Sequence, residues 1–125
     1  MKFLKLKFAI SAPPEEVYIA LTNPFTIELW TGYKAEMSTE PGTEFSLWEG
    51  DIVGKNLAFQ KDKLIKQHWY FEGEPEDSIV TIKLSESGDN TKVELIHENI
   101  PDEVYDEMKD GWKNHYFGAL KKFFK

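Results

Sequence analysis

Three histidines, His68, His97 and His115, carry the side chains that could act as acids, bases or metal ligands near neutral pH. None stands in a His-x-His, His-x-x-x-His or His-Glu-x-x-His pattern, and no cysteine is present to complete a ligand set. No serine lies in a Gly-x-Ser-x-Gly pattern, and no glycine-rich loop of the kind that cradles phosphates occurs. The sequence therefore predicts no metal, no cofactor and no nucleophile–base pair.

His97 is the one titratable residue that we expect to point into the protein. In residues 91–98 apolar and polar side chains alternate, and the alternation places His97 on the inward face. A hydrogen-bonded core histidine is the favoured interpretation, and an acid or base in a cavity is the alternative. The alternative would make the protein an enzyme, such as a cyclase or a hydrolase.

A set of aromatic side chains indicates a second kind of chemistry, the binding of apolar molecules. Each one taken singly is best explained by core packing, but several tryptophans and tyrosines around one helix often line a pocket. We expect an elongated apolar cavity, with Tyr116 and His97 as its polar contacts. The residues predicted to line it are Trp30, Phe45, Leu47, Trp69, Val80, Ile82, Leu95, His97, Met108, Trp112 and Tyr116.

The composition and the net charge of the sequence exclude some classes of binding partner. The 125 residues are the size of one domain, which we expect to span residues 1–125. The formal net charge is −7 and every basic residue is a lysine, so no guanidinium can bind phosphates or guanines, and we expect no nucleic-acid partner. No apolar run approaches the ~20 residues of a membrane span or resembles a signal peptide. We therefore expect a cytoplasmic protein without a membrane span.

Alternating apolar and polar side chains predict β-strands along most of the chain. The first covers residues 2–11, and its inward side chains are Leu4, Leu6, Phe8 and Ile10. Further strands are predicted at residues 33–37, 43–48, 52–59, 63–71, 78–85 and 91–98. Their inward side chains include Phe45, Leu47, Trp69, Val80, Ile82, Leu84, Val93 and Leu95. The short turns between these strands indicate an antiparallel meander.

Helices are predicted in two places. Pro14 suits the first position of a short helix, and Asn23-Pro24 ends it and starts a second one. One long helix begins at Pro101-Asp102 and runs to the end of the sequence. Its apolar stripe, wide enough to face a sheet, comprises Val104, Tyr105, Met108, Trp112, Tyr116, Ala119, Leu120 and Phe123.

Two glycines, Gly111 and Gly118, lie with His115 along one edge of this stripe. A glycine inside a helix costs about 1 kcal/mol relative to alanine. Close approach of the helix backbone to a strand would offset that cost, and room left for a ligand is the alternative explanation.

The order of these elements is similar to the helix-grip fold of START-like and birch-pollen-allergen-like proteins. The implied class is α+β, with a curved antiparallel sheet of six or seven strands around a long C-terminal helix and two short helices after the first strand. Several segments narrow the resemblance, including Pro-Gly-Thr-Glu-Phe-Ser-Leu at 41–47 and Gly-Trp-Lys-Asn-His-Tyr-Phe at 111–117. The others are residues 10–24, 50–54, 64–71, 91–95 and 100–101. In this order they resemble the family named for the activator of the Hsp90 chaperone ATPase, in the SRPBCC superfamily.

The resemblance implies three functions, which we rank. Binding of a hydrophobic small molecule comes first, because stand-alone members of the superfamily bind apolar molecules and the aromatic set fits such a role. Contact with an Hsp90-type chaperone comes second. The matched unit is the C-terminal of the two domains of the eukaryotic co-chaperone, and the N-terminal domain, which carries much of the ATPase stimulation, has no counterpart among these residues. An enzyme using His97 comes third.

Overall fold

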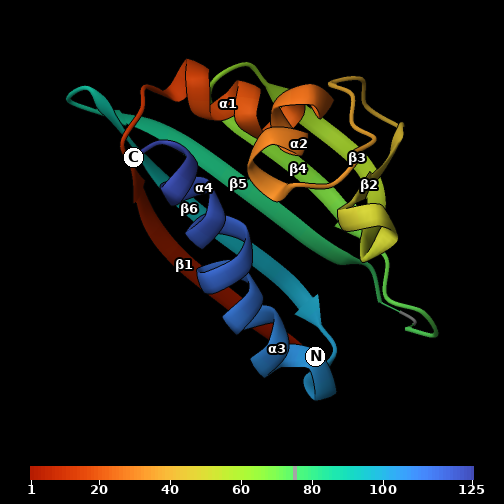
Figure 1. Ribbon diagram of the computed structural model, residues 1–125. Coiled ribbons are helices and arrows are strands. Elements are labelled where there is room, and N and C mark those ends of the chain that lie inside the picture. The colour runs from red at the N-terminus through yellow and green to blue at the C-terminus, as the bar shows by residue number, and fades with distance from the viewer. Residues whose placement is uncertain (75) are drawn as a thin grey trace.

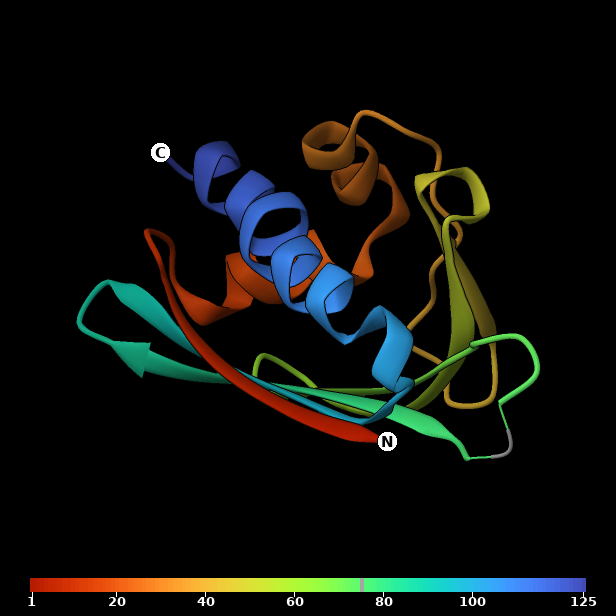
Figure 2. The ribbon, with the colours of Figure 1, turned by 90° about the horizontal axis from the view of Figure 1, so that it is seen from below.

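Alternating side chains build six strands in the computed structural model, which describes residues 1–74 and 76–125. The strands are β1 (Lys2–Ile10), β2 (Glu44–Leu47), β3 (Ile52–Gln60), β4 (Leu64–Trp69), β5 (Ser78–Ser87) and β6 (Asn90–Ile100). They form one antiparallel sheet in the order β1-β6-β5-β4-β3-β2. The predicted α+β class is confirmed, because this sheet curves around a helix at the C-terminal end of the chain (Figures 1 and 2).

Two short helices follow β1, as predicted. Helix α1 (Pro14–Thr22) starts with Pro14 at its first position, and α2 (Pro24–Thr31) is capped by the Asn23 side chain, which accepts a hydrogen bond from the Thr26 amide at 3.1 Å. The Trp30 indole N–H donates to the Ala20 carbonyl oxygen at 2.7 Å. This bond joins α2 to α1 and fixes the Trp30 ring inside the protein.

The C-terminal helix, residues 102–123, changes its hydrogen-bond pattern along its length. It consists of η2 (Asp102–Val104), α3 (Tyr105–Asp110), η3 (Gly111–Tyr116) and α4 (Phe117–Phe123). The segment η3 is π-helical, and the Phe117 amide donates to the Trp112 carbonyl oxygen, five residues back. Figure 2 shows this helix lying above the curved sheet.

The core lies between this helix and the sheet. All eight inward side chains predicted for the later strands are buried, and so are Leu4 and Ile10 of β1, while Leu6 and Phe8 are half-buried. The register places His97 of β6 opposite Leu4 of β1 and Val80 of β5. His97 therefore sits in the middle of the apolar face.

The predicted strand at residues 33–37 is wrong. Among the described residues of this segment only Glu36 pairs, through one isolated bridge with Ser46 whose N···O distances are 2.9 and 3.0 Å. The alternation of apolar and polar residues correctly indicated which side chains face inward, since Ala35 and Met37 are half-buried. This pattern of side chains cannot show whether the backbone pairs with a neighbouring strand.

The predicted apolar stripe is wrong at one end of the helix. Phe123 is 38% exposed, whereas Phe117, which the stripe omitted, is fully buried and stacks on Phe8 at 4.5 Å between ring centroids. The π-helical turn explains the difference, because its longer hydrogen-bond span rotates the residues that follow relative to a regular α-helix.

Neither glycine of the helix is explained by close approach to a strand. A Cβ atom at Gly111 would meet nothing within 4 Å, so that position borders open space. A Cβ atom at Gly118 would lie 2.8 Å from the Lys113 carbonyl oxygen, five residues back in the same helix. Gly118 therefore fits the π-helical turn, and Gly111 fits the alternative of room beside the helix.

Candidate functional site

A pocket of about 370 Å³ lies between the C-terminal helix and the turn that joins β2 to β3. That turn contains η1 (Trp48–Gly50). The volume lies near the lower end of the range of small-molecule sites, roughly 300–1,000 Å³. We call this the aromatic pocket, and its lining residues are Trp48, Asp51, Ile52, Trp69, Met108, Gly111, Trp112, His115 and Tyr116.

The π-helical segment forms one wall of the aromatic pocket. Four of its six residues, Gly111, Trp112, His115 and Tyr116, line the pocket. In a π-helix the hydrogen bonds link residues five apart, so residues four and five apart come to share one face. The pocket wall therefore coincides with this departure from α-helical geometry, a feature that is frequent at functional sites.

Two tryptophans of the pocket are stacked and held in place by buried polar side chains. The rings of Trp69 and Trp112 lie 4.7 Å apart at an interplanar angle of 28°. The Trp69 indole donates to Gln67 Oε1 at 3.0 Å, and Gln67 Nε2 donates to Asn56 Oδ1 at 3.1 Å. Because each indole N–H has a partner, both rings have a fixed orientation before any ligand arrives.

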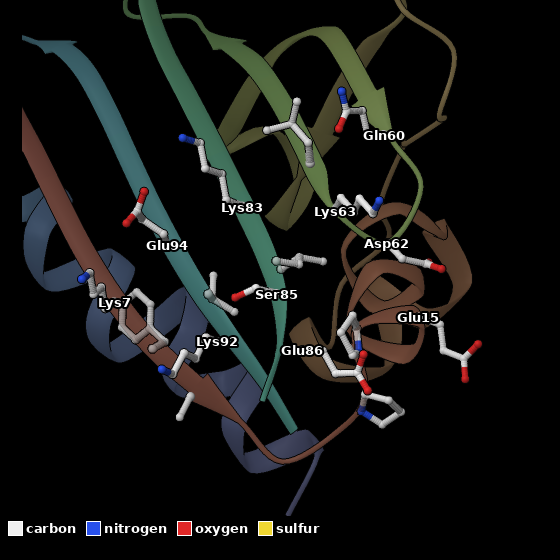
Figure 3. Close-up of a pocket in the computed structure, with 17 residues that line it drawn as sticks. Lys7, Glu15, Gln60, Asp62, Lys63, Lys83, Ser85, Glu86, Lys92 and Glu94 are labelled. Atoms are coloured by element: carbon white, nitrogen blue, oxygen red, sulfur yellow. The ribbon is translucent and has the colours of Figure 1, made fainter. Parts of the chain in front are cut away.

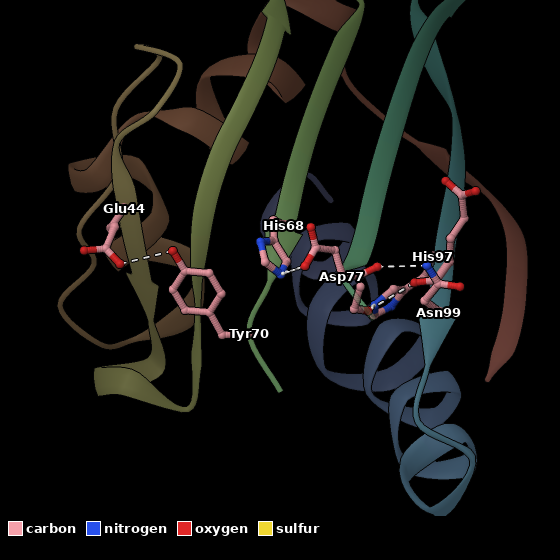
Figure 4. Close-up of polar contacts among 8 residues, drawn as sticks. Glu44, His68, Tyr70, Asp77, His97 and Asn99 are labelled. Atoms are coloured by element: carbon pink, nitrogen blue, oxygen red, sulfur yellow. Dashed lines mark hydrogen bonds and ion pairs between the residues drawn. The ribbon is translucent and has the colours of Figure 1, made fainter. Parts of the chain in front are cut away.

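His97 holds the second of these tryptophans. The Trp112 indole donates to His97 Nδ1 at 3.1 Å. His97 Nε2 lies 2.8 Å from the Ser78 hydroxyl oxygen (Figure 4). An indole N–H can only donate, so Nδ1 accepts and the proton lies on Nε2, which donates to Ser78. Ser78 donates in turn to the Glu98 carbonyl oxygen at 3.1 Å.

Burial keeps His97 neutral. Its side chain is fully buried, and the loss of hydration lowers its pKa from 6.5 to about 3. Both ring nitrogens are occupied, and His97 is not part of the pocket wall. This arrangement is that of a hydrogen-bonded core histidine.

Strained backbone places Trp48 on the opposite wall. Trp48 has φ 50°, Glu49 has φ 54° and Gly50 has φ 96°, so three successive residues are left-handed. This conformation is routine for glycine and costly for a bulky side chain. Strain of this kind persists where surrounding contacts enforce it, and it clusters at functional sites. Here the Trp48 ring contacts Trp30 and Tyr116, with ring centroids 5.7 and 5.8 Å apart.

The structure brings four of the eleven predicted lining residues together at the pocket: Trp69, Met108, Trp112 and Tyr116. The other seven lie in the buried core behind it: Trp30, Phe45, Leu47, Val80, Ile82, Leu95 and His97. Five residues of the wall were not among the predicted lining: Trp48, Asp51, Ile52, Gly111 and His115. For Gly111 and His115, the position at the edge of the apolar stripe of the helix was the sequence feature that could have indicated a place in the pocket wall. No sequence pattern indicated the left-handed turn that brings in Trp48.

A larger hollow of about 1340 Å³ lies on another part of the surface (Figure 3). Its lining includes Lys7, Lys83 and Lys92, which occupy exposed strand positions between buried or half-buried ones, and the half-buried Glu94. The hollow therefore lies on the solvent-facing side of the sheet. Lysines and carboxylates line much of this hollow, whereas aromatic side chains line much of the aromatic pocket.

Residues 1–74 and 76–125 contain neither a metal-binding cluster nor a membrane-spanning helix. No three His, Cys, Asp or Glu side chains in these ranges converge so as to hold a metal ion. None of the described helices combines the length and the apolar character needed to cross a membrane.

Comparison with known proteins gives a consistent match. The family model of the activator of Hsp90 ATPase homologue 1-like proteins matches residues 11–125. An activator of 90 kDa heat shock protein ATPase homologue from Dictyostelium discoideum is 29% identical over 98% of this chain and 33% of its own length. The chain thus spans about a third of the length of the curated relatives it matches.

Solved structures show the same fold. A crystal structure of an HSP90 activator from Plasmodium falciparum has a TM-score of 0.89 and 27% identity, covering 98% of this chain and 96% of the other. The crystal structure of CalU16 from Micromonospora echinospora has a TM-score of 0.84 and 29% identity, covering 98% and 74%. The helix-grip architecture predicted from the order of elements is confirmed by these likenesses.

Proposed function

The chain belongs to the family of activator of Hsp90 ATPase homologue 1-like proteins, and we propose that it is a binding protein that holds a hydrophobic small molecule in the aromatic pocket. The observation that carries the proposal is the pocket itself, an opening of about 370 Å³ walled by three tryptophans, a tyrosine, Ile52 and Met108. Burying apolar ligand surface there gains roughly 25 cal/mol per Å².

The fixed walls support binding by a preformed site. Trp69 and Trp112 are held by hydrogen bonds to Gln67 and His97, so little side-chain freedom is lost when a ligand enters. The buried His97 already uses both ring nitrogens within the core, which favours binding over acid–base chemistry as the role of this site.

Titration with N-phenyl-1-naphthylamine, an apolar dye that fluoresces in apolar surroundings, tests the proposal. We expect a saturable rise in fluorescence with the wild-type protein. Gly111→Leu fills the open space beside the helix and should weaken dye binding at least about tenfold. A saturation curve that Gly111→Leu leaves unchanged would show that the dye binds elsewhere, and absence of wild-type binding would remove the proposal.

Lys113→Leu is the matched control for that experiment. It adds the same side chain to the same π-helical turn, but Lys113 is exposed and is not part of the pocket wall. We expect it to bind the dye as the wild type does.

A second candidate function is contact with an Hsp90-type chaperone. The observation in its favour is the likeness to the Plasmodium falciparum HSP90 activator, which covers nearly the whole of both chains. The net charge of −7 would steer the protein toward a basic surface, an effect that salt weakens.

An ATPase assay tests this second function with the Hsp90-type chaperone of the same organism. We expect added protein to raise chaperone turnover at low salt and to raise it less at high salt. Unchanged turnover at saturating protein, with no complex in a pull-down, would exclude it. Gly111→Leu in the same assay would show whether the pocket takes part.

A further inference from the structure

The Tyr116 hydroxyl has no hydrogen-bond partner among the residues that the structure describes. Tyr116 is 96% buried, since only 4% of its surface is exposed. Its ring is held by aromatic neighbours, with centroids 4.6 Å from Trp112, 5.0 Å from Phe117 and 5.2 Å from Trp30. A ring held on several sides cannot turn to find a partner elsewhere.

The Tyr116 hydroxyl oxygen is not sealed off from the surface. No fully buried side-chain nitrogen or oxygen atom of the described residues lacks a partner, so the unpaired Tyr116 oxygen retains some contact with the accessible surface. The opening that Tyr116 lines is the aromatic pocket. A ligand that enters this opening and displaces water from the hydroxyl leaves that donor unpaired, at a cost of roughly 1–3 kcal/mol, unless the ligand brings an acceptor.

The donor is present at every physiological pH. Burial raises the pKa of Tyr116, so the phenol keeps its proton. The other polar side chains of the wall, Asp51 and His115, are exposed. The inner part of the pocket therefore offers one donor among aromatic side chains.

We propose that the pocket takes a flat two-ring molecule bearing a carbonyl oxygen, and that the Tyr116 hydroxyl donates a hydrogen bond to that oxygen. This inference rests on the proposed binding function and narrows its ligand. Flat rings can pack against the aromatic side chains of Trp48, Trp69 and Trp112, of which Trp112 is itself stacked between Trp69 and Phe117. A carbonyl only accepts, so it pairs with Tyr116 without bringing a second donor that the inner wall would leave unpaired.

Competition against N-phenyl-1-naphthylamine with two matched compounds tests the inference. 1-Tetralone and tetralin share the same two-ring frame, and only 1-tetralone has the carbonyl. The affinity ratio of 1-tetralone to tetralin should fall about tenfold in Tyr116→Phe relative to the wild type, because one hydrogen bond of typical net strength is lost. Tyr18→Phe, which removes a tyrosine hydroxyl outside the pocket, should leave the ratio unchanged.

The outcomes separate the inference from the function on which it rests. If Tyr116→Phe leaves the affinity ratio of 1-tetralone to tetralin unchanged, the proposed hydrogen bond is overturned. Dye binding to the wild type would in that case still support the pocket as a binding site. Dye binding that neither compound displaces overturns the ligand class. Absence of dye binding to the wild type overturns both proposals. The thermal unfolding midpoint of Tyr116→Phe should equal that of the wild type. This would establish that a reduced affinity ratio does not come from misfolding of the variant.

Discussion

His97 links the sheet to the C-terminal helix through both of its ring nitrogens. Its Nδ1 accepts from Trp112 on the helix, and its Nε2 donates to Ser78 on β5. Strand alternation predicted that His97 points inward, but it could not predict the partner, because Trp112 lies 15 residues away on another element. The interaction requires a neutral ring, and it therefore connects protein stability to pH.

The free energy of unfolding should fall as the pH drops from 7 to 5. The pKa of His97 is about 3 in the folded protein and 6.5 as the unperturbed value, so between these pH values only the unfolded state binds the proton. The stability is fully present above pH 6.5 and decreases as the pH falls through this window. The expected loss at pH 5 is about 2 kcal/mol, measured by urea unfolding at each pH.

Two variants isolate this effect from that of other groups. His97→Gln should lose most of the pH dependence between pH 7 and 5, while His68→Gln, which replaces a more exposed histidine, should keep it. Equal slopes for the wild type and His97→Gln would show that His97 is not the group responsible.

At the scale of elements, the C-terminal helix is where prediction from the sequence was least complete. The helix itself, its start and most of its buried stripe followed from the spacing of apolar side chains. The π-helical turn did not, because apolar periodicity assumes a regular α-helix throughout. That turn buries Phe117, and it forms the wall of the pocket with Trp112 and Tyr116.

The two helix glycines should respond oppositely to alanine. Gly111→Ala adds a methyl group to open space and should raise the free energy of unfolding by about 0.5–1 kcal/mol, through the better helix propensity of alanine. Gly118→Ala places a methyl group 2.8 Å from the Lys113 carbonyl oxygen, so the backbone must shift and the free energy of unfolding should fall by about 1 kcal/mol or more. Denaturant unfolding of both variants checks this, and stabilisation by Gly118→Ala would argue against the π-helical turn.

A glycine at position 49 should relieve the backbone strain of the left-handed turn before β3. Glu49 is exposed and has φ 54°, a conformation that costs a residue with a Cβ atom about 1–2 kcal/mol. Glu49→Gly should raise the free energy of unfolding by about 0.5–1 kcal/mol, because the gain is partly offset by the greater freedom of glycine in the unfolded chain. Glu49→Ala keeps the Cβ atom and should give no such gain, so equal thermal midpoints for the two variants would contradict the assignment of strain.

At the scale of the whole molecule, the fold was more predictable than the site. Alternation, turn residues and helix caps are local signals, and they located five of the six later strands and both short helices. The pocket depends on the meeting of the turn at Trp48 with the helix at Gly111, which are distant in sequence. Most of the predicted lining instead packs behind the pocket, because inward-facing positions include both the core and the cavity wall.

The most direct test of the binding function uses the three methionines as internal reporters. The chain contains only Met1, Met37 and Met108, so a protein labelled with carbon-13 at the methionine methyl groups gives three NMR signals. Met108 lines the aromatic pocket, while Met1 and Met37 do not. Titration with N-phenyl-1-naphthylamine should shift the Met108 signal to saturation and leave the other two in place. An unmoved Met108 signal, or a larger shift of Met37, would contradict binding in the aromatic pocket.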